Sequence, residues 1–329
     1  IDGRVAVLDS LFGACTAQAL ITSNMVRPRI QGCRFSGSAL SAINGATVAG
    51  ATISNNAITI APGSACIEFS ALTDSSITSN RCICTAGGTG IVYTGGSNRN
   101  TVSNNTISVT SGTGIFTTSS ANVISGNAIE TTAASCINMT GAASIISGNR
   151  LNRSAAGGAV VIIAGSSVTC AGNVIEYTGT GVGVSCAQST CSIVGNVINA
   201  IANGDTQISV LNTFCTVSGN TLTAGAGQTN PMISIAAAAA SCTISGNALN
   251  SGALAPIGIN LAAPQCTISS NIVKCIDAAA LNVVATALNC SYIGNTLRCT
   301  GVAVNAATRV NAATGVSFGN QIDGGWNTV

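Results

Sequence analysis

Hydrophobic and polar residues recur along this chain in a short motif: an aliphatic residue, a polar residue, a small residue, Asn, any residue and a second aliphatic residue. Clear copies are Ile53–Ile58, Val102–Ile107 and Ile146–Leu151. The Asn of each copy, here called the anchor, returns every 22 to 27 residues. The anchors are Asn56, Asn80, Asn105, Asn127, Asn149, Asn173, Asn196, Asn220, Asn247, Asn271, Asn295 and Asn320.

Between the anchors, apolar residues alternate with Ser and Thr, which is the pattern of a half-buried strand. A leucine-rich repeat has a similar period, but the chain lacks a Leu framework and helical periodicity. We therefore predict an all-β fold, a right-handed single-stranded parallel β-helix (a solenoid) of about 13 coils of about 24 residues. It covers residues 21–323, between an N-terminal cap at residues 1–20 and a C-terminal tail, or the start of a missing domain, at residues 324–329.

The motif suggests how each coil turns its corner. Asn tolerates the left-handed backbone conformation, so we expect the anchor itself to make the sharp turn. Stacked anchors are expected to hydrogen-bond along the column, and the small residue before each anchor leaves room at the corner. Ile1–Val7 lacks a Met and the organisation of a signal peptide, which predicts a fragment or a processed product.

The Asn and aliphatic columns resemble the pectate-lyase-like β-helix superfamily over roughly Ile21 to Asp323. That superfamily includes pectate lyases, polygalacturonases, alginate epimerases, adhesins and bacteriophage tailspikes. The lyases use calcium-binding Asp clusters and the polygalacturonases use paired Asp with a His, whereas here the Asp residues are isolated and His is absent. The resemblance is therefore closest to a phage tailspike or tail-fibre shaft, and it implies a parallel homotrimer.

Composition and charge exclude several classes of partner and of catalytic site. Only 6% of the residues are charged and the net charge is +2, so we expect no nucleic-acid partner and no attraction to anionic lipid. The apolar stretches are too short to cross a bilayer, and we expect no membrane insertion. The absence of His excludes Ser-His-Asp and Cys-His catalysis. Outward apolar residues just after the anchors indicate a covered face: Val174, Val197 and Ile272.

The 15 Cys residues are ordered along the repeat. One column lies five residues before successive anchors, and a second lies four residues after them. Both face inward by alternation, which predicts buried free thiols as core filler, with no metal and no cofactor. Abundant thiols favour assembly in a reducing bacterial cytoplasm, as for a virion protein, over an extracellular or cell-surface location. The two columns are Cys191, Cys215, Cys242, Cys266 and Cys290, and Cys275 and Cys299.

The most polar column lies three residues after the anchors. Glu130 and Glu176 are two coils apart in this column, which predicts about 10 Å between their Cα atoms. That spacing suits the carboxylate pair of an inverting glycosidase, so both are candidate catalytic residues. The structural alternative is a surface salt-bridge network. The candidate substrate-binding residues around the pair are Arg150, Asn152, Arg153, Tyr177 and Asp205.

These observations predict a phage tailspike-like or tail-fibre-like protein that binds cell-surface polysaccharide. One alternative is a polysaccharide-degrading hydrolase or lyase of the same fold. The other is an adhesin or a purely structural rod.

Overall fold

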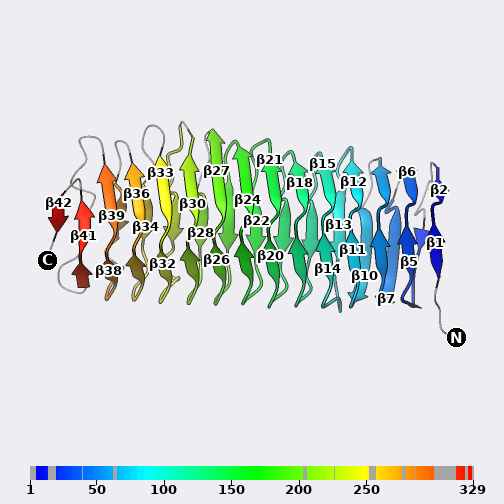
Figure 1. Cartoon of the computed structure of the whole chain (residues 1–329), viewed down its shortest axis with the longest axis horizontal. Helices are drawn as coiled ribbons and strands as arrows, with labels where there is room; N and C mark the ends of the chain where they lie inside the picture. Colours follow the sequence, from blue (N-terminus) through cyan, green and yellow to red (C-terminus); the bar gives the residue numbers. More distant parts are fainter. Residues whose placement is uncertain are drawn as a thin grey trace. The chain divides into compact units, whose positions relative to one another are not determined.

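The computed structural model describes residues 5–13, 20–38, 40–61, 65–202, 206–225, 227–251, 257–275, 279–284, 286–299, 316–322 and 325–327. The chain divides into two compact units, Ile1–Ser154 and Ala155–Val329. Each unit is a solenoid of short strands that form three parallel sheets (Figure 1). Sheet 1 holds the strands before the anchors, sheet 2 the strands after them, and sheet 3 the third strand of each coil.

In the first unit, every strand of a sheet pairs in parallel with the strand one coil away. Sheet 1 contains β1 (Ala6–Leu8), β5 (Arg29–Gln31), β8 (Thr52–Ser54), β11 (Ser76–Thr78), β14 (Thr101–Ser103), β17 (Val123–Ser125) and β20 (Ile145–Ser147). Sheet 2 contains β2 (Leu11–Phe12), β6 (Arg34–Ser38), β9 (Ala57–Ile60), β12 (Arg81–Cys84), β15 (Thr106–Val109), β18 (Ala128–Thr131) and β21 (Arg150–Arg153). Sheet 3 contains β3 (Leu20–Ile21), β4 (Met25–Val26), β7 (Ile43–Ala49), β10 (Ala65–Thr73), β13 (Thr89–Tyr93), β16 (Ile115–Thr117) and β19 (Ile137–Met139).

The second unit repeats this arrangement. Sheet 1 contains β23 (Thr169–Ala171), β26 (Ser192–Val194), β29 (Thr216–Ser218), β32 (Thr243–Ser245), β35 (Thr267–Ser269), β38 (Ser291–Ile293) and β40 (Val316–Phe318). Sheet 2 contains β24 (Val174–Thr178), β27 (Val197–Ala202), β30 (Thr221–Ala224), β33 (Ala248–Ser251), β36 (Ile272–Cys275), β39 (Thr296–Cys299), β41 (Asn320–Ile322) and β42 (Gly325–Asn327). Sheet 3 contains β22 (Ala159–Ile163), β25 (Val182–Cys186), β28 (Ile208–Val210), β31 (Ile233–Ile235), β34 (Ile259–Leu261) and β37 (Leu281–Val283).

The predicted parallel β-helix is therefore confirmed. Residues two apart in a strand share a face, and the aliphatic residue of each motif points inward onto its counterpart in the next coil. Ile53, Ile77 and Val102 form one such column of fully buried side chains. Each fully buried aliphatic side chain contributes about 1.5–3 kcal/mol of hydrophobic stabilisation. Among the described residues, no helical segment has the length and hydropathy of a membrane span.

The anchors form a buried hydrogen-bonded ladder, as the sequence predicts. The side-chain oxygen of Asn127 accepts hydrogen bonds from both the backbone N–H and the side-chain amide of Asn105, at 2.9 and 3.0 Å. The side-chain amide of Asn127 also donates to the backbone carbonyl of Val102 at 2.9 Å. The same bonds join Asn220 to Asn247 in the second unit. The ladder therefore gives partners to backbone groups that the corner would otherwise bury unsatisfied.

The corner itself differs from the prediction. The left-handed residue is the small one before the anchor, as in Asn55 (φ 56°), Gly126 (φ 64°) and Gly219 (φ 62°). The anchor follows it with its side chain turned into the core. Gly or a short polar residue is needed before the anchor because a positive φ is costly for larger side chains.

Both ends of the described chain carry strands. Within residues 1–20, for which a cap is predicted, β1 and β2 pair in parallel with β5 and β6. The cap stays a prediction. At the other end, β42 turns back and pairs antiparallel with β41, with Trp326 opposite Gln321. Asp323 and Gly324 lie outside the described residues.

The cysteines follow the predicted inward columns. Thirteen free cysteines are described and all are buried, including the column from Cys191 to Cys290. Cys275 is also buried, whereas the side chain of Cys299 lies outside the described part. The thiols therefore act as small core side chains, as expected from their spacing.

Candidate functional site

A shallow groove of about 190 Å³ lies on the outward face of sheet 2 in the first unit. It crosses β15, β18 and β21, and its middle strand presents Ala128 between Thr106 and Arg150 in register. Because Ala128 is smaller than both of these neighbours, the surface is hollow at this point. The groove is lined by Thr106, Ile107, Ser108, Ala128, Ile129, Glu130, Arg150 and Asn152.

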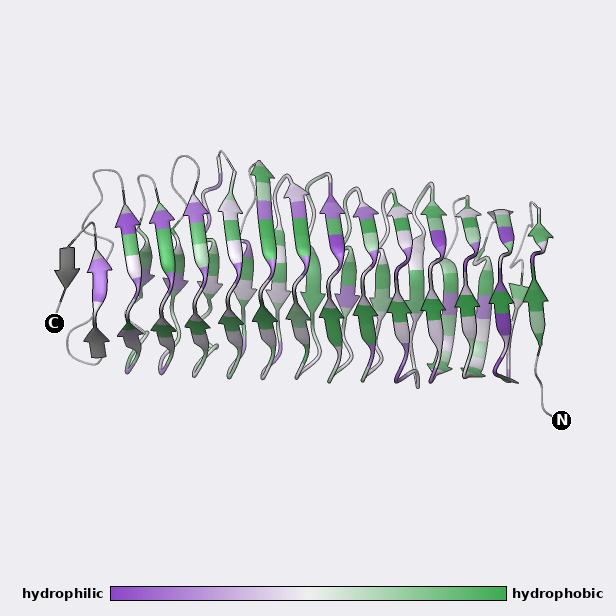
Figure 2. Ribbon diagram, viewed as in Figure 1, coloured by the Kyte–Doolittle hydropathy of each residue, from purple (hydrophilic) through white to green (hydrophobic). Residues whose placement is uncertain are grey.

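The polar groups around this hollow are free to bind a ligand. Glu130 and Arg150 are exposed, and Asn152 is half-buried beside Glu130 in the ladder. The Glu130 and Arg150 side chains have no hydrogen-bond or ion-pair partner among the described residues. Figure 2 shows that hydrophilic residues interrupt β18 and dominate β21. The groove therefore combines a carboxylate, a guanidinium and an amide with the hydroxyls of Thr106 and Ser108.

Arg153 does not line the groove. Its side chain is fully buried, because it lies two residues after buried Leu151 and on the same inward face. Arg150 and Asn152 take the alternate, outward positions. Burial raises the pKa of the Cys136 thiol to about 12, although the positive charge of Arg153 opposes the rise. Arg153 therefore points into the core and away from the groove, and its contact with substrate stays a prediction.

The predicted site residues of the second unit also divide between the outward face and the core. Glu176 is half-buried on the outward face of β24, in register with Asn199. Tyr177 follows it and is fully buried, so it is a core residue and not a groove residue. Asp205 lies outside the described residues. Since Glu130 belongs to the first unit and Glu176 to the second, the carboxylate pair stays a prediction.

A second groove of about 320 Å³ lies on the outward face of sheet 2 within the second unit. It crosses β30, β33 and β36 in the same way, with Ala248 between Thr221 and Ile272. This groove carries Lys274 but no carboxylate among its lining residues. They are Thr221, Leu222, Thr223, Ala248, Leu249, Asn250, Ile272 and Lys274.

The chemical groups that sequence reasoning missed are the small and hydroxylic ones. Thr106, Ser108 and Ala128 lie one or three residues after their anchors, as do Arg150 and Asn152. Aligning all coils on the anchors would therefore have found the floor of the groove as well as its charges. The signal was overlooked because Ala and Thr carry no distinctive chemistry by themselves.

Among the described residues, one group of side chains could bind a metal ion, and it lies in the buried interior and not in an outward groove. The sulfur atoms of Cys186, Cys191 and Cys215 lie within 4.8 Å of one another in the buried interior of the second unit. The sequence columns place Cys191 and Cys215 together. Cys186 was missed because it belongs to a different strand of the coil.

Solved structures and a family model show some similarity to this chain. A tailspike protein of E. coli bacteriophage HK620, determined with a pentasaccharide, is 9% identical and has a TM-score of 0.49, with 98% of this chain and 72% of that chain covered. The catalytic unit of a GH87 alpha-1,3-glucanase from Streptomyces thermodiastaticus is 15% identical, with a TM-score of 0.42 and coverage of 98% and 64%. No curated protein matched the chain. Residues 17–175, slightly less than half of the chain, match the family model described as "Right handed beta helix region".

Proposed function

We propose that this chain binds polysaccharide in the groove over β15, β18 and β21. The observation that carries the proposal is the hollow at Ala128, bordered by the unpaired Glu130 and Arg150 side chains and by Asn152. A carbohydrate presents hydroxyls that both donate and accept hydrogen bonds. Charged donors and acceptors make the stronger bonds to such groups. A shallow, open groove also suits an extended chain that enters and leaves along the surface.

Binding is favoured over hydrolysis by the count of carboxylates. Glycoside hydrolysis ordinarily uses two carboxyl groups that flank the scissile bond. Among the residues that line this groove, Glu130 is the sole carboxylate. Polysaccharide cleavage remains the second candidate function, with Glu130 as the acid in this groove.

A steric variant with a matched control tests the proposal. We expect Ala128→Trp to fill the groove and to abolish polysaccharide binding. Affinity electrophoresis measures the binding, with gels that contain the capsule or O-antigen polysaccharides that retard the wild type. Ala248→Trp fills the second groove and is expected to leave binding unchanged. Loss of binding in Ala248→Trp alone would move the site to the second unit, and loss in neither variant would remove the proposal.

Incubation of the protein with the same capsule and O-antigen polysaccharides distinguishes a binding protein from an enzyme. Reducing ends released without ultraviolet absorbance would indicate a hydrolase, and absorbance from an unsaturated sugar would indicate a lyase. We expect neither product from a polymer that the protein binds. A product that disappears in Glu130→Gln would instead establish the enzyme.

The phage tailspike location and the homotrimer remain predictions. Val174 and Val197 are 39% and 37% exposed, as expected for an apolar face that a partner covers, whereas Ile272, 58% exposed, lines the second groove. A sedimentation velocity profile of a single monomeric species would remove the support for a trimer.

A further inference from the structure

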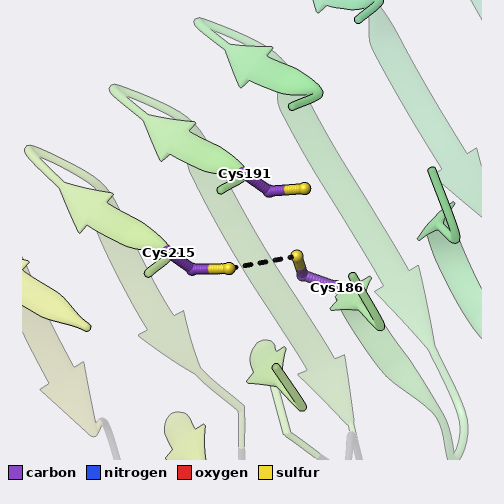
Figure 3. Close-up of side chains that lie close together, drawn as sticks. All are labelled: Cys186, Cys191 and Cys215. Atoms are coloured by element: carbon purple, nitrogen blue, oxygen red, sulfur yellow. Dashed lines mark hydrogen bonds between the residues drawn. The ribbon is translucent and has the colours of Figure 1, made fainter. Parts of the chain in front are cut away.

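Three thiols meet inside the second unit, between two different sheets. Cys191 precedes β26 and Cys215 precedes β29, so both belong to the column before the anchors. Cys186 ends β25 in sheet 3 and points toward them across the interior (Figure 3). The Cys186 and Cys215 sulfurs are 3.8 Å apart, and all three sulfurs lie within 4.8 Å of one another.

The third sulfur makes this place unlike the remainder of the column. Cys186 stands in register with Val210, and the ladder continues through Ile235 and Leu261. Coils farther along therefore offer an aliphatic side chain where this coil offers a thiol. Cys242, Cys266 and Cys290 have no sheet 3 cysteine in register with them, and the three-sulfur arrangement arises once among the described residues.

We propose that Cys186, Cys191 and Cys215 bind a soft divalent metal ion of the Zn²⁺ class. A zinc–sulfur bond is about 2.3 Å long, so three sulfurs arranged evenly around the ion lie about 4.0 Å apart. The Cys186 and Cys215 sulfurs are 3.8 Å apart, and all pairs lie within 4.8 Å, so no pair needs to close by more than about 0.8 Å. Soft thiolate ligands select this class of ion over hard cations such as Mg²⁺ and Ca²⁺.

The present hydrogen bonds show what binding would replace. The backbone carbonyl of Gln188 accepts from the thiols of both Cys186, at 3.3 Å, and Cys215, at 3.2 Å. The Cys191 thiol donates to the carbonyl of Gly165 at 3.4 Å. The thiols are thus neutral donors with partners. Zn²⁺ would displace these protons, because only the thiolate is an effective ligand.

Charge limits how the ion is held. An uncompensated thiolate is unfavourable in a buried interior, so the three thiols lose their protons only as the ion binds. Three thiolates around Zn²⁺ release three protons to solvent and leave one net negative charge. The affinity of the site therefore falls as the pH is lowered.

The test uses the whole chain, expressed with Zn²⁺ in the medium so that burial does not prevent entry. After dialysis, we expect the wild type to retain one more zinc equivalent than Cys186→Val, which installs the residue that β28 carries in register. Cys290→Val removes a thiol from the same column outside the site, and it should retain as much zinc as the wild type. Equal zinc in wild type and Cys186→Val would overturn the proposal.

X-ray absorption of the wild-type zinc complex gives a second readout that needs no variant. A shell of three sulfurs at about 2.3 Å is expected. A shell of nitrogen and oxygen alone would refute the site even if Cys186→Val fails to fold. Neither result bears on the outward groove, so this inference and polysaccharide binding stand or fall separately.

Discussion

The two grooves on sheet 2 are built on the same plan and differ most in three outward side chains. Each crosses three strands and places Ala on the middle strand, with Thr and an aliphatic residue on the first. Ser or Thr follows on the first strand and Ile or Leu on the middle strand. The charge differs because the first groove carries Glu130, Arg150 and Asn152 where the second carries Asn250, Ile272 and Lys274. The hollow therefore follows from the framework, whereas its charge is set by a few outward residues.

This difference separates what shapes a site from what selects a ligand. The first groove offers a carboxylate and a guanidinium, whereas the second offers a single ammonium group beside an apolar side chain. The strands of both grooves follow equivalent buried anchors, such as Asn127 in the first groove and Asn247 in the second. We therefore expect framework substitutions to affect the two grooves equally and outward substitutions to affect one groove alone.

The largest effect is expected from the framework. Asn127 precedes the middle strand of the first groove, and Asn247 precedes the middle strand of the second. Replacing either by Ala leaves several buried amide and carbonyl groups without partners, at about 1–3 kcal/mol each. We expect both variants to lose at least about 3 kcal/mol of unfolding free energy, read from denaturant midpoints by circular dichroism.

The matched controls are Ser125→Ala and Ser245→Ala, whose side chains are half-buried on the outward face of sheet 1. Both should stay within about 0.5 kcal/mol of wild type. If one anchor variant is stable and the other is not, the two frameworks are not equivalent.

An exchange of outward side chains should have a smaller but selective effect. Arg150→Ile gives the first groove the residue of the second, and it removes a charge-assisted donor. We expect polysaccharide binding to weaken about 10- to 100-fold with no change in thermal stability. Ile272→Arg is the reciprocal variant, and titration calorimetry should show whether the second groove gains any affinity. An Arg150→Ile protein that binds as tightly as wild type would place the ligand elsewhere.

The smallest effect is expected at the acid. Glu130→Gln keeps the length and the acceptor oxygen of the side chain but removes its charge. Since an amide still hydrogen-bonds to sugar hydroxyls, we expect affinity to fall by less than about tenfold. Asn250→Gln, the counterpart in the second groove, should leave affinity unchanged. A larger loss in Glu130→Gln would show that the ligand requires the carboxylate charge.

The sequence predicted the fold because one signal is repeated in every coil. The anchors fixed where strands begin, and alternation fixed which side chains turn inward. The candidate site was predicted less well. Arg153 and Tyr177 lie four residues after their anchors, as does Cys275, which was correctly placed inside. Chemistry suggested an exposed Arg and a ligand-stacking Tyr, but the pleat of the strand decided their direction.

Other errors came from interactions that no single coil reveals. The left-handed residue was assigned to the anchor, whose tolerance of that conformation is real. In the structure, the anchor side chain is occupied by the ladder, and the small residue before it makes the turn. The cluster at Cys186 was missed because it joins two sheets, while column alignment compares residues within one.

The anchor ladder has one more consequence, for how such a chain changes over generations. Asn105 and Asn127 are 22 residues apart, Asn220 and Asn247 are 27 residues apart, and the amide–oxygen distances are 3.0 and 2.9 Å. The hydrogen bonds of the ladder depend on the position of the neighbouring anchor and not on the number of residues between the two anchors. Insertions and deletions away from the corners can therefore accumulate without disturbing the stack. A lineage could reshape the loops of individual coils, or duplicate an entire coil, while its interior stays the same.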